Sequence, residues 1–564
     1  FVGSLHAQYR TTTYCNPLNL DYTYPFHNSH LGKSYRSGAD PAVVEFRGEY
    51  YMFVTRSWGY WHSKDLLNWD FITPEKWYFE GCNAPAAHNY KDSILYVCGN
   101  PSGAMSILYT DNPKRGDWKA VPSVLHDLQD PALFIDDDER AYMYWGSSNR
   151  WPIRGKELDM KNKFLPIAKK PDSLLFLRPD IHGWERFGEN HTSDIKPFIE
   201  GAWMTKHNGK YYLQYAAPGT QFNVYGDGVY VGKSPLGPFQ YAAHNPFCYK
   251  PGGFATGAGH GSTVCGPGGI YWHFGTIHLS INYKFERRLC MFPTFFDEDG
   301  VMYSDTYFGD YPHYSPDQVS RQTTSGGFRG WMLLSYGKPV KASSQLESYP
   351  VENVTDENLK TFWVAGKNDD KQWVEIDLEE VSDVYALQLN FFDYEETGFW
   401  GRMPNLRQRY LVEASVDGAR WRVLVDYRNS FRDAPHNYIE LDQPIEARYI
   451  RYRHHYVPGK NLAMGNIRVF GLGRGKKPAT VKGFTVVREA DERNVRISWK
   501  AVKGAQGYNV LWGVAPDKLY SSWMVYGDNS LDLRALTVGQ KYYFAIEAFN
   551  ENGISQRVFL REAH

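Results

Sequence analysis

The alternation of apolar and polar residues over roughly the first 325 positions predicts short β-strands joined by tight turns. Five tyrosine-rich units, each a turn followed by a strand, recur at intervals of about 44 to 70 residues, the scale of a four-stranded propeller blade. No long helical periodicity interrupts them. The pattern therefore predicts an all-β fold that begins with a five-bladed β-propeller over residues 14–325. The five units are residues 48–53, 92–97, 139–144, 209–214 and 269–274.

The pattern changes near residue 330, which predicts further β-modules. Residues 332–473 are more polar and carry period-two apolar patches, such as residues 372–378. A Lys-Lys-Pro stretch at residues 476–478 reads as a linker, and strand patterns resume over residues 478–564. We therefore expect three consecutive modules, because a chain of 564 residues exceeds one ordinary core.

Composition narrows the classes of function. The net charge is −1, so there is no basic field for nucleic acid, and no apolar run approaches the ~20 residues of a membrane helix. Aromatic residues make up 16% of the chain, which suits both β-cores and contacts with sugar rings. The six cysteines show no metal-ligand spacing, which leaves disulfides and buried thiols as alternatives.

Residues 1–13 read as the remnant of a signal peptide with a cut after Ala7, followed by an N-terminal arm. A fortuitous arm is the alternative, because the charged and apolar parts of a signal are missing. The first interpretation predicts an exported protein, periplasmic or extracellular.

Three acidic motifs stand at corresponding points of the repeat. Asp40-Pro41 and Asp130-Pro131 each precede a short apolar run, and Glu200-Gly201 opens a third. Each acid lies eight or nine residues before a tyrosine-rich strand, so we expect each on the innermost strand of its blade. The three carboxylates should then meet in the central channel, an arrangement that fits hydrolysis of a glycosidic bond.

These motifs, the blade repeat and the sequence at residues 257–262 resemble glycoside hydrolase family 43 over roughly residues 14–315. The resemblance implies Asp40 as general base, Asp130 as the residue that modulates the pKa and orients the acid, and Glu200 as general acid. It also implies inversion, with base and acid about 6.5–9.5 Å apart. A retaining fructan enzyme of the same fold is disfavoured, because its motifs differ at all three acids.

The resemblance suggests further contacts. His260 matches a histidine that helps hold a structural calcium or sodium ion, through water, although a lone core histidine is the alternative. No other cofactor is required. Arg287 matches a substrate-contacting position, whereas Arg288 should point to the other strand face. Trp58 and Trp203 are candidate pocket walls, with core packing as an equal interpretation.

The later modules have resemblances of their own. Residues 332–473 resemble discoidin-like (coagulation factor 5/8 type C) jelly rolls, and residues 478–564 resemble a fibronectin type III sandwich. In the latter, Trp499 would be the core tryptophan and Tyr542 the tyrosine corner. The loop at residues 395–400 is a candidate ligand contact or a packing element.

The acidic run at residues 136–139, in the first module, fits a hairpin turn better than a calcium loop.

Together these features predict an exported, inverting exo-glycosidase that removes terminal pentoses from plant oligo- or polysaccharides. We favour an α-L-arabinofuranosidase, with a β-D-xylosidase on the same scaffold as the alternative. A non-catalytic carbohydrate-binding or adhesion protein is the alternative from another class. The sequence leaves the oligomeric state open.

Overall fold

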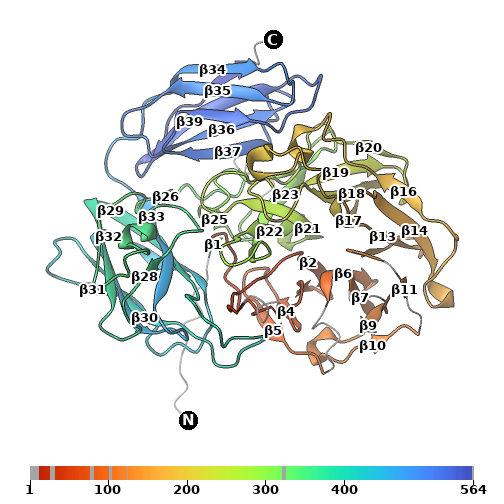
Figure 1. The fold of residues 1–564 in the computed structure, drawn as a ribbon, viewed down its shortest axis with the longest axis horizontal. Helices are drawn as coiled ribbons and strands as arrows, with labels where there is room; N and C mark the ends of the chain where they lie inside the picture. Colours follow the sequence, from red (N-terminus) through yellow and green to blue (C-terminus); the bar gives the residue numbers. More distant parts are fainter. Residues whose placement is uncertain are drawn as a thin grey trace.

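The fold is built almost entirely from β-strands arranged in three modules (Figure 1). The computed structural model describes residues 12–25, 32–75, 82–100, 104–122, 125–126, 128–319 and 326–561. Most of the predicted N-terminal arm, residues 1–11, lies outside the described residues. In the described ranges, the helical segments are short 3-10 turns, and none is long and apolar enough to cross a membrane.

The first module consists of five antiparallel blades, as predicted. In every blade the tyrosine-rich unit found in the sequence forms the second strand. Blade I holds β2 (Ala42–Phe46), β3 (Glu49–Phe53), β4 (Tyr60–Ser63) and β5 (Asp70–Ile72); blade II holds β6 (Asn83–Tyr90), β7 (Ile94–Asn100), β9 (Leu108–Thr110) and β10 (Lys119–Ala120); blade III holds β12 (Ala132–Ile135), β13 (Ala141–Trp145), β14 (Ile153–Asp159), β15 (Leu165–Pro166) and β16 (Asp172–Leu175); blade IV holds β17 (Glu200–His207), β18 (Lys210–Ala217), β19 (Gly226–Gly232) and β20 (Phe239–Tyr241); blade V holds β21 (Gly257–Cys265), β22 (Tyr271–His278), β23 (Arg287–Phe296) and β24 (Met302–Ser304).

The inner strands of the blades form a closed ring. Strand β2 contacts β6, β6 contacts β12, β12 contacts β17, β17 contacts β21, and β21 returns to β2. The two ends of the propeller are joined by β1 (Thr13–Tyr14), which pairs with β25 (His313–Tyr314). Because the blades are equivalent, residues at the same point of each inner strand must approach the central axis together.

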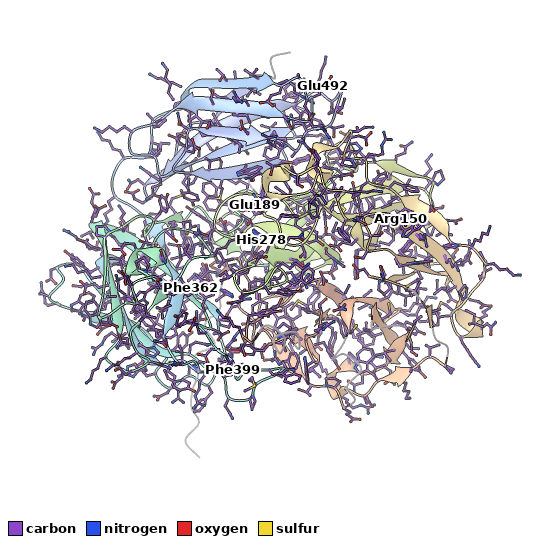
Figure 2. All side chains as sticks on the ribbon, viewed as in Figure 1. Arg150, Glu189, His278, Phe362, Phe399 and Glu492 are labelled. Carbon is purple, nitrogen blue, oxygen red and sulfur yellow. The ribbon has the colours of Figure 1, made fainter. Side chains whose placement is uncertain are left out.

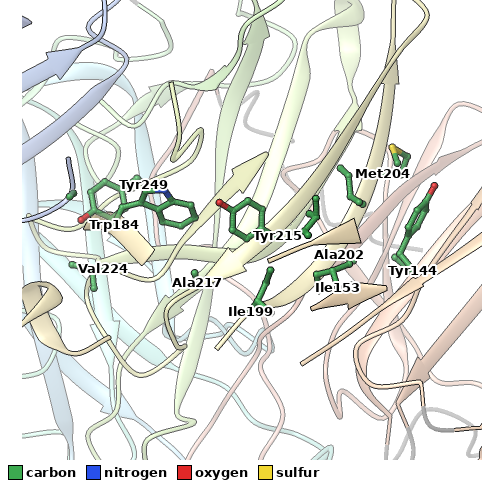
Figure 3. Packing of buried hydrophobic residues seen from close by; sticks show 14 of the residues in the cluster. Tyr144, Ile153, Trp184, Ile199, Ala202, Met204, Tyr215, Ala217, Val224 and Tyr249 are labelled. Carbon is green, nitrogen blue, oxygen red and sulfur yellow. The ribbon is translucent and has the colours of Figure 1, made fainter. Parts of the chain in front are cut away.

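Large aromatic side chains fill the wedges between the blades. Figure 3 shows Tyr144 of blade III beside Met204 of blade IV, and Tyr215 of blade IV farther along the same apolar cluster, beside Trp184. The outer parts of neighbouring blades diverge, so bulky rings are needed there to exclude water. Many aromatic residues in the part of the chain that the structure describes therefore serve the core, one of the two uses that the composition suggested.

The second module is one strongly bent sheet. Strand β29 (Trp373–Phe391) runs 19 residues with register shifts on both sides of Ser382 and pairs with two long strands. These bends wrap the sheet around a core that includes Trp363. The strands are β26 (Met332–Leu333), β27 (Val340–Ala342), β28 (Trp363–Val364), β29, β30 (Arg409–Ser415), β31 (Arg422–Asp426), β32 (His436–Tyr456) and β33 (Ala463–Leu472).

The third module is a two-sheet sandwich. Trp499 is buried at its centre, and the Thr537 backbone N–H donates to the Tyr542 hydroxyl at 3.0 Å, the bond expected of a tyrosine corner. Its assignment to the fibronectin type III fold stays a prediction. One sheet holds β34 (Lys482–Arg488), β35 (Val495–Lys500) and β38 (Ser530–Leu533); the other holds β36 (Gly507–Gly513), β37 (Ser521–Tyr526), β39 (Tyr543–Asn550), β40 (Gly553–Ile554) and β41 (Val558–Arg561).

The second module packs directly against the propeller. Figure 2 shows Phe399 where the module meets blade I, and its ring lies 5.0 Å from that of Tyr24. The Phe399 backbone N–H donates to Ser34 Oγ at 3.0 Å, and Gly401 forms a backbone bridge with Tyr24. The loop at residues 395–400 therefore serves the packing role that the sequence left open.

Two other local alternatives are decided by the structure. Residues 136–139 form the turn between β12 and β13, where Asp136 pairs with Lys206, as the hairpin prediction required. Cys15, Cys98, Cys248 and Cys290 are buried thiols rather than disulfide partners.

Candidate active site

The inner strand of each blade, at or near its start, contributes to the lining of one cavity of about 260 Å³. Asp40, Ala84, Asp130 and His260 each stand at or near the start of an inner strand with φ between 41° and 55°. In blade IV the left-handed residue is Gly201, which follows Glu200. Non-glycine residues rarely adopt this conformation, and a cluster of them is typical of a functional site. The predicted convergence of the three acids is confirmed.

The contribution of blade II was missed in the sequence. Ala84-Pro85-Ala86-Ala87 has the same form as the stretch starting at Asp40 and the stretch starting at Asp130, with alanine in place of the acid. Ala84 is buried and lines the cavity. Comparing the X-Pro-Ala stretches with one another, rather than searching for acids, would have found it.

Asp40 lies among donors that favour its ionised form. Its Oδ2 accepts from the Thr55 hydroxyl at 2.6 Å, and its Oδ1 lies 3.3 Å from His260 Nδ1 and 3.5 Å from an Arg287 nitrogen. Burial raises the pKa of Asp40, but Arg287, His260 and the Thr55 hydrogen bond outweigh it, so the pKa is lowered. This carboxyl is therefore suited to accept a proton.

Asp130 has the opposite electrostatic environment. Burial raises its pKa, Glu200 and Asp40 raise it further, and His260 and a hydrogen bond from Ser147 only partly offset this, so the pKa reaches about 7. Ser147 Oγ also lies 3.0 Å from Glu200 Oε2, so its one hydrogen serves either acid, and the Tyr225 hydroxyl donates to Glu200 Oε1. Asp130 and Glu200 thus form a pair linked through Ser147, in which Asp130 can retain a proton near neutral pH.

His260 connects the two kinds of carboxyl. Its Nδ1 lies 3.3 Å from Asp40 and 3.9 Å from Asp130, and its backbone N–H donates to Asp227 at 2.7 Å. Burial lowers the pKa of His260, but the surrounding carboxylates raise it by more, so the pKa lies above its ordinary value. A side chain at position 201 would press on the imidazole, since a Cβ there would meet the ring at 3.0 Å. Glycine therefore permits the close approach.

Three groups that could bind a metal ion meet at His260. Ligand atoms of Asp130, Glu200 and His260 lie within 4.8 Å of one another. Calcium, however, takes six to eight oxygen ligands, whereas Glu200 already accepts from Ser147 and Tyr225 and His260 Nδ1 faces Asp40 as an ion-pair partner. This donor set does not suit direct coordination of calcium. The ion held through water stays a prediction from the sequence.

Arg287 and Arg288 point to opposite faces of their strand, as the alternation of side chains predicted. Arg287 lines the cavity and lies beside Asp40. Arg288 points away, is buried, and donates from its Nε to His436 of the second module at 2.8 Å. Arg287 is thus the arginine placed to contact a substrate.

The tryptophans predicted as pocket walls lie elsewhere, so that prediction is corrected. Trp203 packs into the core between blades and donates to the Thr263 carbonyl at 3.3 Å, because the register shift after Glu200 turns its side chain away from the axis. Trp58 lies against Gly401 of the second module. Other residues line the cavity instead, and the sequence did not indicate them. Within the described ranges they are Pro25, Tyr35, Ser37, Thr55, Arg56, Asn83, Ser147, Thr220 and Phe285.

The comparisons with known proteins agree with this geometry. Residues 35–302 match the model of glycosyl hydrolases family 43, and residues 339–464 match that of the F5/8 type C domain. The chain thus carries a family 43 glycosyl hydrolase domain followed by an F5/8 type C, or discoidin-like, domain.

Among characterised relatives, a beta-xylosidase of Xylanibacter ruminicola is 33% identical over 133 residues, which cover 20% of this chain and 39% of the relative. An arabinoxylan arabinofuranohydrolase of Bacillus subtilis (strain 168) is 30% identical over 189 residues, 29% of this chain and 34% of the relative. The matches thus span well under half the length of these relatives. A solved thermostable family-43 glycoside hydrolase gives a TM-score of 0.44 at 20% identity, covering 54% of this chain and 100% of its own.

Proposed function

We propose that the protein hydrolyses glycosidic bonds with inversion and releases terminal pentose residues from plant oligo- or polysaccharides. One observation carries the proposal. A single cavity holds Asp40, whose pKa is lowered, and the Asp130–Glu200 pair, in which the pKa of Asp130 is raised to about 7. An enzyme that needs one ionised base and one protonated acid at the same pH requires such a separation.

In the proposed step, Asp40 takes a proton from water while the water oxygen bonds to the anomeric carbon. The glycosidic carbon–oxygen bond breaks, and Glu200 gives its proton to the departing oxygen. Asp130 supports Glu200 through charge and through Ser147, which contacts both. Inversion requires about 6.5–9.5 Å between base and acid to accommodate the water, and this separation is part of the proposal.

We favour α-L-arabinofuranose as the released sugar and keep β-D-xylose as the alternative. The relatives described above include a beta-xylosidase and an arabinoxylan arabinofuranohydrolase by name. A cavity of about 260 Å³ is small beside the ~300–1,000 Å³ of typical ligand pockets, which favours one terminal sugar over an internal stretch of chain. Export to the periplasm or the outside of the cell would bring the protein to such polysaccharides.

Hydrolysis of 4-nitrophenyl α-L-arabinofuranoside and β-D-xyloside by wild type and Asp40→Asn tests the proposal. We expect wild type to cleave at least one substrate and Asp40→Asn to lose about 10²–10⁴-fold in kcat, because the amide cannot accept the proton. Proton NMR of the first product should show inverted configuration. Turnover by Asp40→Asn at the wild-type rate contradicts the assignment, and an inert wild type favours a carbohydrate-binding protein.

The pH profile of kcat/KM should be bell-shaped. Asp40 acts ionised and its pKa is lowered, so activity should persist below the ordinary aspartate value of about 3.9. It should be lost only when the pH falls through the lower pKa of Asp40 itself. Asp130, beside Glu200, holds a proton that it loses as the pH rises through about 7, so we expect the alkaline limb there. In Asp130→Asn the charge is gone, so the alkaline limb should move to lower pH. An alkaline limb unchanged in that variant would remove Asp130 from the pair.

A further inference from the structure

Thr55 links Asp40, the proposed general base in blade I, to the backbone of blade II. The Ala84 N–H donates to Thr55 Oγ1 at 2.8 Å, and Thr55 Oγ1 donates to Asp40 Oδ2 at 2.6 Å. The Thr55 backbone is itself held, because its N–H donates to the Ala39 carbonyl at 3.0 Å. The next residue links the two blades again, since the Arg56 N–H donates to the Cys82 carbonyl at 2.8 Å. The hydroxyl is therefore fixed from both blades.

These contacts determine where the hydroxyl hydrogen points. A threonine hydroxyl has one hydrogen to donate and lone pairs to accept. A backbone N–H can only donate, so Ala84 occupies a lone pair and the hydrogen is directed to Asp40 Oδ2. The two oxygens of Asp40 therefore differ. Oδ2 is held by Thr55, whereas Oδ1 faces His260 at 3.3 Å and Arg287 at 3.5 Å at the cavity.

We propose that Thr55 is a positioning residue for Asp40: its hydroxyl, oriented by the Ala84 N–H, holds Oδ2 and leaves Oδ1 to take the proton of the attacking water. This inference rests on the proposed function, in which Asp40 is the base. Thr55 itself does not touch the reacting atoms. It restrains the rotation of the carboxylate, and its hydrogen bond favours the ionised form.

Charged and titratable groups surround Asp40 from the other blades. Arg287 comes from blade V, as does His260, while Asp130 and Tyr225 face it from blades III and IV. Thr55 is neutral and does not titrate in this range. Replacing it therefore changes the orientation and hydrogen bonding of Asp40 without removing a charge.

Steady-state kinetics of Thr55→Val and Thr55→Ser test the inference. Valine keeps the branched shape but removes the hydroxyl, and we expect kcat to fall about 10- to 100-fold with little change in KM, the size of one hydrogen bond to a charged group. The acid limb of kcat/KM should move to higher pH, because ionised Asp40 loses a donor. Serine restores the hydroxyl and should restore both kcat and the acid limb.

Thr276→Val is the matched control. Thr276 is buried on β22 and accepts the Asp40 backbone N–H at 2.9 Å, so this variant also loses a buried hydroxyl that caps a backbone donor. Its thermal unfolding should shift as much as that of Thr55→Val, without the change in the acid limb. If Thr55→Val does not fold, Thr55→Cys takes its place, and its weaker donor should give a kcat below that of Thr55→Ser.

The outcomes separate the two proposals. Wild-type kcat in Thr55→Val beside an inactive Asp40→Asn overturns the role of Thr55 alone. Equal impairment of Thr55→Ser and Thr55→Val also overturns it, because the methyl group and not the hydroxyl would then matter. Full activity in Asp40→Asn overturns the proposed function instead.

Discussion

Replacing Glu200 by glutamine is expected to lower kcat on arabinoxylan oligosaccharides by about 10²–10⁴-fold, the usual contribution of a general acid. Glutamine preserves the local structure, because its oxygen can accept from Tyr225 and its amide can donate to Ser147, the two groups that hold Glu200. Only the transferable proton is lost. The defect should be smaller on 4-nitrophenyl glycosides, since nitrophenolate departs without protonation. Initial rates on both substrate classes measure the difference.

Glu185→Gln is the matched control for that experiment. Glu185 is a fully buried glutamate of the same propeller and accepts from the Tyr215 hydroxyl at 2.6 Å, much as Glu200 accepts from Tyr225. It does not line the cavity in the described ranges. Activity should survive this change. Equal losses in the two variants, or equal losses of Glu200→Gln on both substrate classes, would contradict the acid role.

Replacing Asp433 by asparagine is expected to weaken both the contact between the first two modules and substrate binding. Asp433 receives two bonds from Arg36, at 2.6 and 2.8 Å, and the Arg36 side chain is only 3% exposed. Breaking a buried ion pair at one end typically costs about 3–5 kcal/mol, and we expect less here because Arg36 keeps a second ion pair with Asp393 at 3.3 Å. Tyr35 and Ser37 flank Arg36 and line the cavity, and the Arg287 N–H donates to Ser37 Oγ at 3.1 Å. KM should therefore rise more than kcat falls.

Calorimetry and kinetics check this prediction together. Asp433→Asn should lower the unfolding temperature of the transition that includes the propeller and raise KM. Asp426→Asn, which removes an exposed pair with Arg428 on the same module, should change neither, because surface pairs contribute little. An unaltered KM in Asp433→Asn would show that the second module does not shape the cavity.

The β-strand pattern and the repeat could be read from the sequence because both are local. Period-two alternation and tyrosine-rich turn–strand units reappear as the second strands of the five blades. The convergence of Asp40, Asp130 and Glu200 also followed, since equivalent points of a closed ring must meet. Ala84 was overlooked although its sequence signal is of the same kind, because a methyl group does not suggest chemistry.

What the sequence could not provide depends on contacts between distant segments. Trp203 was placed in the pocket by its nearness to Glu200, but a register shift sends it into the core. Phe285 lines the cavity although a long stretch of chain separates it from each of the three acids. No local pattern encodes such proximity.

The sequence by itself determined the three β-modules, the five-blade repeat and the three acids, because each produces a short-range pattern of residues along the chain. Only the tertiary structure decided how those acids differ. Asp40 is held ionised by Thr55, Arg287 and His260, whereas burial and neighbouring carboxylates keep a proton near Asp130. The reason is physical: a pKa depends on burial and on charges a few ångströms away, and these come from other blades.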